Sequence, residues 1–247
     1  MTGFRVLAAA TLVWAAAEGA DGKARPPKGR GGEGWKRQVQ AGVNVTEGNR
    51  DSSLARAQFG GRGRGEGWDT ELNLKAEIGR ADGVQNRERV AAEAAHRRGL
   101  TDRAYMAYRL DATYDAIAEL DYRIIGSLSL GWYAIRDDQQ EFRLEVGPAG
   151  VVERKEGVES SRPAIRIAEA YEARITKVSR MVQGVEYVPE LDADPNDYLL
   201  RAHVELRSDL DVQLSLHVRL EADYDNNPAE GKDKQDTVFS VSFGYSF

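Results

Sequence analysis

The stretch Phe239-Ser240-Val241-Ser242-Phe243-Gly244-Tyr245-Ser246-Phe247 decides the fold class of this chain. Its residues alternate strictly, with aromatic or aliphatic side chains at odd positions and serine or glycine at even positions. A strand with this period of two has one apolar and one polar face. A soluble protein seldom exposes such a strand, because an apolar edge promotes aggregation. We therefore expect residues 239–247 to close a bacterial outer-membrane β-barrel, with the apolar face turned to lipid.

The amino-terminal sequence indicates export. Arg5 precedes an apolar run over residues 6–17, which is too short to span a bilayer as a helix. Ala15-Ala16-Ala17 fits the small-residue rule for signal peptidase, so residues 1–17 are expected to be a cleaved signal peptide. Residues 18–34 are rich in glycine, proline and charge, and they are expected to form a flexible periplasmic lead-in to a barrel over residues 35–247.

Composition sets limits on function. The formal net charge of the 247 residues is −6, with both signs mixed along the chain, which argues against nucleic acid as a partner. There is no cysteine, which excludes disulfides, a thiol nucleophile and a cysteine-ligated metal.

From residue 35 onward the chain reads as alternating segments separated by turn residues. The fold class that this pattern predicts is all-β, an antiparallel up-and-down transmembrane barrel of about twelve strands. The alternation breaks near Ala168 and Glu169, where a β-bulge would restore the two faces. Residues 61–67 are expected to form an unusually long periplasmic turn. The expected strands are 35–46, 52–60, 67–80, 87–98, 102–115, 118–135, 139–153, 162–174, 179–189, 198–208, 211–224 and 236–247.

Each strand has a charged face opposite its apolar face. In the 118–135 strand, for example, the apolar set runs from Leu120 to Trp132 and the polar set from Asp121 to Ser129. Because twelve strands lie between filled eight-stranded barrels and open sixteen-stranded porins, a salt-bridged lumen with a narrow or closed pore is predicted. The residues expected to face the lumen are Arg109, Asp111, Asp121, Arg123, Arg143, Glu145, Arg201, His203, Glu205, His217, Arg219 and Glu221.

Aromatic residues gather at the predicted strand ends. If both termini are periplasmic, the tryptophans of the barrel segment all fall at the periplasmic interface, where amphipathic rings are favoured. The expected membrane-interface anchors are Trp35, Trp68, Trp132, Tyr245 and Phe247.

The chain resembles a known family in two places. Gly42-Val43-Asn44-Val45-Thr46-Glu47-Gly48-Asn49 is similar to the first-strand G-x-N-x-T-x-G-N pattern of the domain-of-unknown-function family 481 (DUF481), although Glu47 stands where a smaller residue is common. The segment 126–150, with Gly131-Trp132-Tyr133 and Leu144-Glu145-Val146-Gly147-Pro148, is also similar. Members of this Gram-negative family are described as salt-induced outer-membrane proteins, and the resemblance implies an envelope or osmotic-stress role without supplying catalytic residues.

The sequence shows weak signals for chemistry. A serine hydrolase needs a serine beside a histidine base that a third polar group holds, and the chain has three histidines. Ser215 and His217 share one strand face, but polar residues recur evenly along every strand, which favours an ordinary polar lining. No catalytic residue, cofactor or metal site is therefore expected.

Three classes of function stay open at this stage. The first is a non-enzymatic outer-membrane barrel in contact with outer-membrane lipid, which the barrel-assembly machinery would recognise through strand 239–247. The second is a barrel enzyme that acts on lipid. The third is a soluble periplasmic barrel that binds a ligand, in which the apolar faces would form the core. The sequence does not indicate an oligomeric state.

Overall fold

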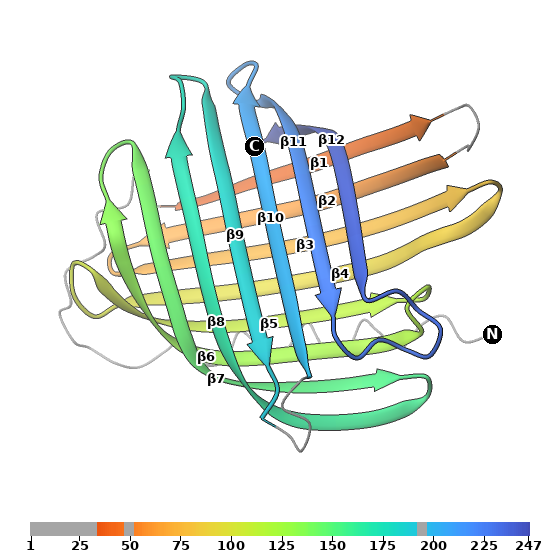
Figure 1. Cartoon of the computed structure of the whole chain (residues 1–247). Coiled ribbons are helices and arrows are strands. Elements are labelled where there is room, and N and C mark those ends of the chain that lie inside the picture. Colours follow the sequence, from red (N-terminus) through yellow and green to blue (C-terminus); the bar gives the residue numbers. More distant parts are fainter. Residues whose placement is uncertain (1–33, 47–51, 192–196) are drawn as a thin grey trace.

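The computed structural model of the chain describes residues 34–46, 52–191 and 197–247. In these residues twelve antiparallel strands form one closed barrel, in which each strand pairs with its sequence neighbours and β1 pairs with β12 (Figure 1). The predicted fold class is thereby confirmed. The signal peptide, the lead-in before Gly34 and the Glu47-Gly48-Asn49 part of the family motif lie outside the described residues. The strands are β1 (Gly34–Thr46), β2 (Ser52–Gly65), β3 (Trp68–Ala81), β4 (Val84–Gly99), β5 (Ala104–Asp115), β6 (Leu120–Arg136), β7 (Gln140–Lys155), β8 (Val158–Arg174), β9 (Ser179–Pro189), β10 (Tyr198–Asp209), β11 (Leu214–Asp225) and β12 (Gln235–Ser246).

The two ends of the barrel differ in their connections. We call the end that holds Gly34 and Phe247 the proximal end, and the opposite end the distal end. Two distal turns consist of two residues each, Asp82-Gly83 and Glu156-Gly157, and all four residues have positive φ. This is the geometry of the tight hairpin turns that match the twist of antiparallel strands. The β11–β12 connection over residues 226–234 is the longest described distal loop.

Alternation places apolar side chains on the outside of the barrel. In β3, Leu72, Leu74 and Ile78 are 42%, 50% and 52% exposed. Glu77, on the opposite face of the same strand, is buried. A soluble barrel of the same sequence would have to bury these leucines and expose the charges. The observed direction of the faces is that of a barrel with lipid around it and a polar interior.

Two sequence-based expectations about β2 and β8 are wrong. Residues 61–65 continue β2, so the proximal turn after it is short; the Trp35 ring packs 3.6 Å from the position of a Cβ on Gly61 and covers this glycine-rich part of the strand. In β8 the pairing runs without a register shift past Ala168 and Glu169, and no bulge forms. The Glu169 carboxylate instead lies on the outward face and accepts a hydrogen bond from Gln183, its neighbour on β9.

The start of β6 also differs from expectation. The pairing with β7 shifts register between Leu120 and Tyr122. This irregularity turns Leu120 inward, where it is 5% exposed, and turns Asp121 outward. Asp121 pairs there with Arg154 at 3.4 Å, and both side chains are at least half exposed. The prediction that Asp121 faces the lumen is therefore wrong, because period-two counting fails across a bulge.

Replacing Gly147 by alanine should lower the free energy of unfolding by about 1–3 kcal/mol, because overpacking forces the backbone to move. A Cβ on Gly147 would lie 2.0 Å from the Leu128 carbonyl oxygen of β6, and this contact is with backbone that cannot rotate away. Gly150 on the same strand is the matched control, since its Cβ would meet nothing within 4 Å. Denaturant unfolding in lipid vesicles measures the difference, and equal losses for G147A and G150A would contradict the close approach of β6 and β7.

Candidate functional site in the barrel interior

Ion pairs between distant strands show which side chains occupy the lumen. Lys75 on β3 lies 3.1 Å from Glu221 on β11, and Arg89 on β4 lies 2.5 Å from Asp223 on β11. Strands β12, β1 and β2 separate β3 from β11 on the shorter way around the wall. Such pairs can therefore form only through the interior, so direct contacts between non-adjacent strands run through part of the lumen.

The first group of crossing contacts is the β3–β11 cluster, formed by Arg56, Lys75, Glu77, Arg87, Arg89, Glu221, Asp223 and Asp236. Its centre is Glu77, whose side chain is fully enclosed and pairs with Arg56 and, at 2.9 Å, with Arg87. Arg56 also pairs with Glu221 across the lumen. Charges this deeply buried need partners of opposite sign, and each one here has them.

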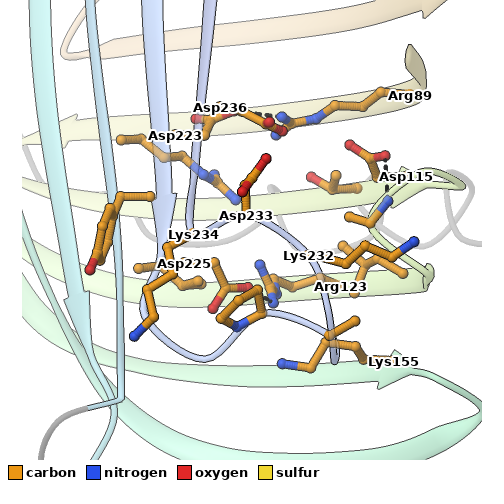
Figure 2. A pocket seen from close by; sticks show the side chains of 18 residues that line it. Arg89, Asp115, Arg123, Lys155, Asp223, Asp225, Lys232, Asp233, Lys234 and Asp236 are labelled. Carbon is orange, nitrogen blue, oxygen red and sulfur yellow. Dashed lines mark hydrogen bonds and ion pairs between the residues drawn. The ribbon is translucent and has the colours of Figure 1, made fainter. Parts of the chain in front are cut away.

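A distal hollow of about 90 Å³ adjoins this cluster. Figure 2 shows Arg89, Arg123, Lys155, Asp223 and Asp225 around it, and the lining mixes both charge signs. A polar hollow of this size has room for a few water molecules. In the same distal half of the barrel, Arg162 of β8 lies 2.5 Å from Glu190 in the β9–β10 connection; burial raises the pKa of Glu190, and Arg162 opposes that rise.

The β11–β12 loop covers the distal mouth. Its Lys232 ammonium lies 2.8 Å from Glu119 in the β5–β6 turn, and the Glu230 amide donates a 2.7 Å hydrogen bond to Glu156 in the β7–β8 turn. Ala229, which precedes Glu230, is 3% exposed. These turns belong to the opposite part of the wall, so the loop reaches across the opening above the hollow (Figure 2).

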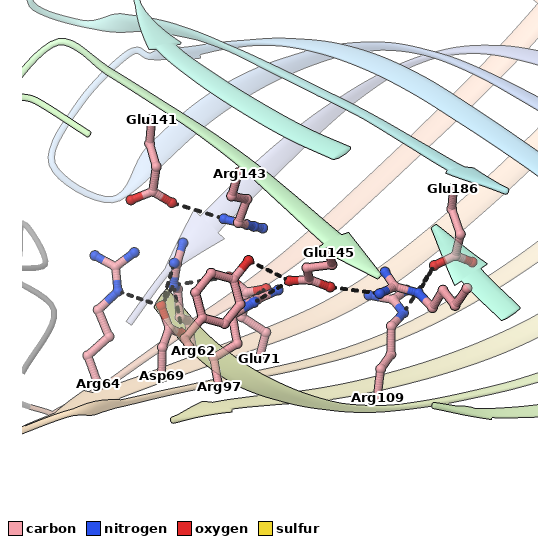
Figure 3. A network of polar contacts seen from close by, with 12 residues as sticks. Arg62, Arg64, Asp69, Glu71, Arg97, Arg109, Glu141, Arg143, Glu145 and Glu186 are labelled. Atoms are coloured by element: carbon pink, nitrogen blue, oxygen red, sulfur yellow. Dashed lines mark hydrogen bonds and ion pairs between the residues drawn. The ribbon is translucent and has the colours of Figure 1, made fainter. Parts of the chain in front are cut away.

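The second group of contacts is the Glu145 network in the proximal half (Figure 3). Glu145 on β7 accepts from Arg166 at 2.7 Å, from the Tyr105 hydroxyl at 2.8 Å and from Arg97 at 3.3 Å. Arg97 also donates to Glu71 at 2.9 Å. Since β5 and β6 separate β4 from β7, the Arg97–Glu145 pair also passes through the interior. The network continues through Arg62, Arg64, Asp69, Arg109, Asp111, Arg143, Glu186 and Arg201.

Apart from Asp121, the predicted lumen residues lie on the inward register positions of their strands. The structure divides them among the groups described here. Glu145, Arg143, Arg109, Asp111 and Arg201 lie in the Glu145 network, Glu221 lies in the β3–β11 cluster, and Arg123 pairs with Glu153 and Asp225 at the distal end. His203 packs its ring over Gly184, where a Cβ would be 2.6 Å away. The remaining three lie near the proximal end, where Glu205 contacts both His217 and Arg219.

Sequence reasoning does not single out several residues that the structure makes central. Arg56, Arg97, Glu153 and Glu186 are each buried or nearly so and each pairs with two or more opposite charges. The sequence could have indicated only that each of these residues faces inward, because side chains alternate between the two faces of a strand. Their importance depends on partners from distant strands, which periodicity does not reveal.

The expected interface anchors lie at the proximal end. Trp35, Trp132, Tyr245 and Phe247 are about half exposed or more, and Trp68 is half-buried beside Gly65. The described residues contain no helix with the length and apolarity to cross a bilayer. Within the described ranges, no group of three or more histidine, aspartate or glutamate side chains has the arrangement to hold a metal ion.

Comparison with solved structures finds barrels of the same fold. The chain is similar to an outer-membrane channel of the COG4313 group from Pseudomonas putida F1, with a TM-score of 0.51 and 10% identity, over 93% of this chain and 100% of that one. It is also similar to the NanC porin, with a TM-score of 0.50 and 11% identity, over 85% of this chain and 97% of that one. At these identities the likeness concerns the fold alone. No curated protein matches the chain.

The family comparison covers most of the barrel. A family model described as "Protein of unknown function, DUF481" matches residues 39–247, from the first strand to the last. This range includes the two segments whose sequence resembled the family. The chain belongs to the DUF481 family.

Proposed function

We propose that this protein is an outer-membrane β-barrel with a closed polar lumen, and that its main role is non-enzymatic. The observation that carries the proposal is the set of ion pairs that join non-adjacent strands through the interior, Lys75–Glu221, Arg89–Asp223 and Arg97–Glu145. A water-filled pore as wide as the barrel wall allows would require these pairs to separate. Separating a buried pair is costly, because each charge loses its partner before it gains full hydration.

The distal loop supports the same proposal independently. Lys232 and Glu230 tie it to turns on the far side of the mouth, so it would obstruct solutes even above the clusters. Among the residues that the structure describes, the lumen also mixes both charge signs along its length and shows no ring of one sign, such as selective channels use.

The surroundings of the barrel follow from its outward face. Apolar side chains such as Leu74 and Leu130 would contact outer-membrane lipid, with the proximal end and its tryptophans on the periplasmic side. We further propose that export uses residues 1–17 as a cleaved signal peptide, and that strand 239–247 is the segment that the barrel-assembly machinery binds. An envelope role under salt or osmotic stress rests on the family resemblance.

Planar-bilayer recording tests the closed lumen. The purified barrel, shown to be folded by heat-modifiable mobility on an unheated gel, should give no current steps of porin size. A general porin purified in the same detergent serves as the positive control. Stable open-pore steps from the folded wild-type protein would contradict the proposal, because the ion pairs across the lumen could not then persist. Recovery in the soluble periplasm on fractionation would instead favour a soluble binding protein.

A further inference from the structure

A line of hydrogen bonds near the proximal opening joins a serine, a histidine and a glutamate. Ser215 Oγ lies 2.9 Å from His217 Nε2, and His217 Nδ1 lies 2.8 Å from Glu205 Oε1. A carboxylate can only accept, so in the neutral imidazole Nδ1 carries the proton and Nε2 accepts from the Ser215 hydroxyl. This is the polarity in which a histidine acts as the general base of a serine nucleophile.

Glu205, the carboxylate of this group, is hydrogen-bonded through both of its oxygens. The second oxygen of Glu205 accepts from Arg219 at 3.1 Å, and Arg219 also pairs with Glu221 at 3.0 Å. These contacts hold the carboxylate against the imidazole and give it a positively charged partner. The sequence placed Ser215 and His217 on one face, whereas the third member comes from the neighbouring strand β10.

Gln38 covers the serine. It reaches from β1 over Gly244 of β12, and its amide Nε2 donates a 2.9 Å hydrogen bond to Ser215 Oγ. A Cβ on Gly244 would lie 2.6 Å from that nitrogen and 2.8 Å from both Ser215 Oγ and His217 Nε2, so a larger residue there would displace these side chains. Ser215 is 1% exposed beneath this amide. Ser215 is also the second residue of β11, directly after the proximal turn, and the Gln38 side chain is hydrogen-bonded to it there.

We propose that Ser215 is an activated nucleophile that accepts an acyl group from a carboxylic ester entering at the proximal end. The Ser215 oxygen would form a bond to the ester carbonyl carbon while its proton passes to His217 Nε2. The bond from that carbon to the alcohol oxygen then breaks, and His217 returns the proton to the departing alcohol. The products are an acyl-serine and an alcohol. This modification is separate from the main role of the barrel and needs no open pore.

Labelling with a fluorophosphonate tests the proposal on the folded full-length barrel. The probe should attach to Ser215, found by peptide mass spectrometry, and the Ser215→Ala variant should not react. His217→Gln should slow labelling about 100-fold or more, the usual contribution of a general base. Gln38→Ala should accelerate labelling by removing the cover. Ser129→Ala is the matched control, because Ser129 is a lumen serine as deeply buried, without a hydrogen-bond partner among the described residues, and its loss should change nothing.

Each variant must first show the heat-modifiable mobility of a folded barrel. Absence of label on both wild type and Gln38→Ala in that state would overturn the proposal, as would an unchanged rate in His217→Gln. Intact-mass measurement then separates the two sources of an ester. An acetyl adduct after p-nitrophenyl acetate indicates a soluble donor, and an oleoyl adduct after incorporation into dioleoyl phospholipid vesicles indicates a membrane lipid. If neither adduct forms, the assignment of an ester as the donor is overturned.

Discussion

Replacing Glu145 by glutamine is expected to lower the free energy of unfolding by about 3 kcal/mol. Glu145 is 7% exposed, and its carboxylate accepts hydrogen bonds from Arg97, Arg166 and Tyr105. Removing one partner of a buried ion pair usually costs about 3–5 kcal/mol, because the remaining charge stays buried. The lower end applies here, since Arg97 keeps Glu71 and Arg166 keeps Glu186.

Denaturant titration in lipid vesicles, followed by tryptophan fluorescence, measures this loss. Asp121→Asn is the matched control, because it removes one carboxylate from an exposed pair with Arg154 and should cost less than about 1 kcal/mol. If Glu145→Gln were no more costly than Asp121→Asn, the proximal lumen would have to be wide and hydrated, and the closed lumen would lose its support there.

Replacing Leu74 by arginine is expected to cost about 2–4 kcal/mol in a bilayer. Leu74 lies at the middle of β3 and its side chain is 50% exposed on the outward face. If that face contacts lipid, a guanidinium at this depth lacks hydration, and the penalty is greatest near the midplane.

Val212→Arg is the control for the same added charge. Val212 is 94% exposed in the proximal turn before β11, where the cost should be close to zero. The same titration in vesicles of defined thickness compares the two variants. Equal stability of Leu74→Arg and Val212→Arg would mean that the outward face of β3 does not lie in the hydrocarbon region.

Much of the wall could be predicted from residue order because its signal is local. In β11, Leu214, Leu216, Val218 and Leu220 take one face and His217 takes the other, and no distant information is needed to see this. The number of strands follows from counting such segments between turn residues. The failures occur where a strand departs from uniform pairing, as at Leu120 and Asp121, because a bulge is set by the neighbouring strand as well as by the chain itself.

Two expected interruptions of strands did not form, because local composition misled. Glycine in residues 61–65 suggested a turn, yet these residues continue β2 beneath the Trp35 ring. At Glu169 the outward carboxylate suggested a bulge, yet the uniform ladder persists and Gln183 supplies a partner. In both places a contact from an adjacent strand outweighs the propensity of the segment.

The sequence by itself determined that this chain is a twelve-stranded barrel with an apolar outside and a charged inside, because side-chain direction alternates along any strand. Only the tertiary structure decided how the inward charges pair. Lys75 and Glu221, or Glu145 and Arg97, are brought together by barrel closure and by the register of several intervening strands. The same holds for the group near the proximal opening, in which Ser215 and His217 come from β11, Glu205 from β10 and Gln38 from β1. Period two specifies a face, whereas a contact across the lumen depends on every register between its partners.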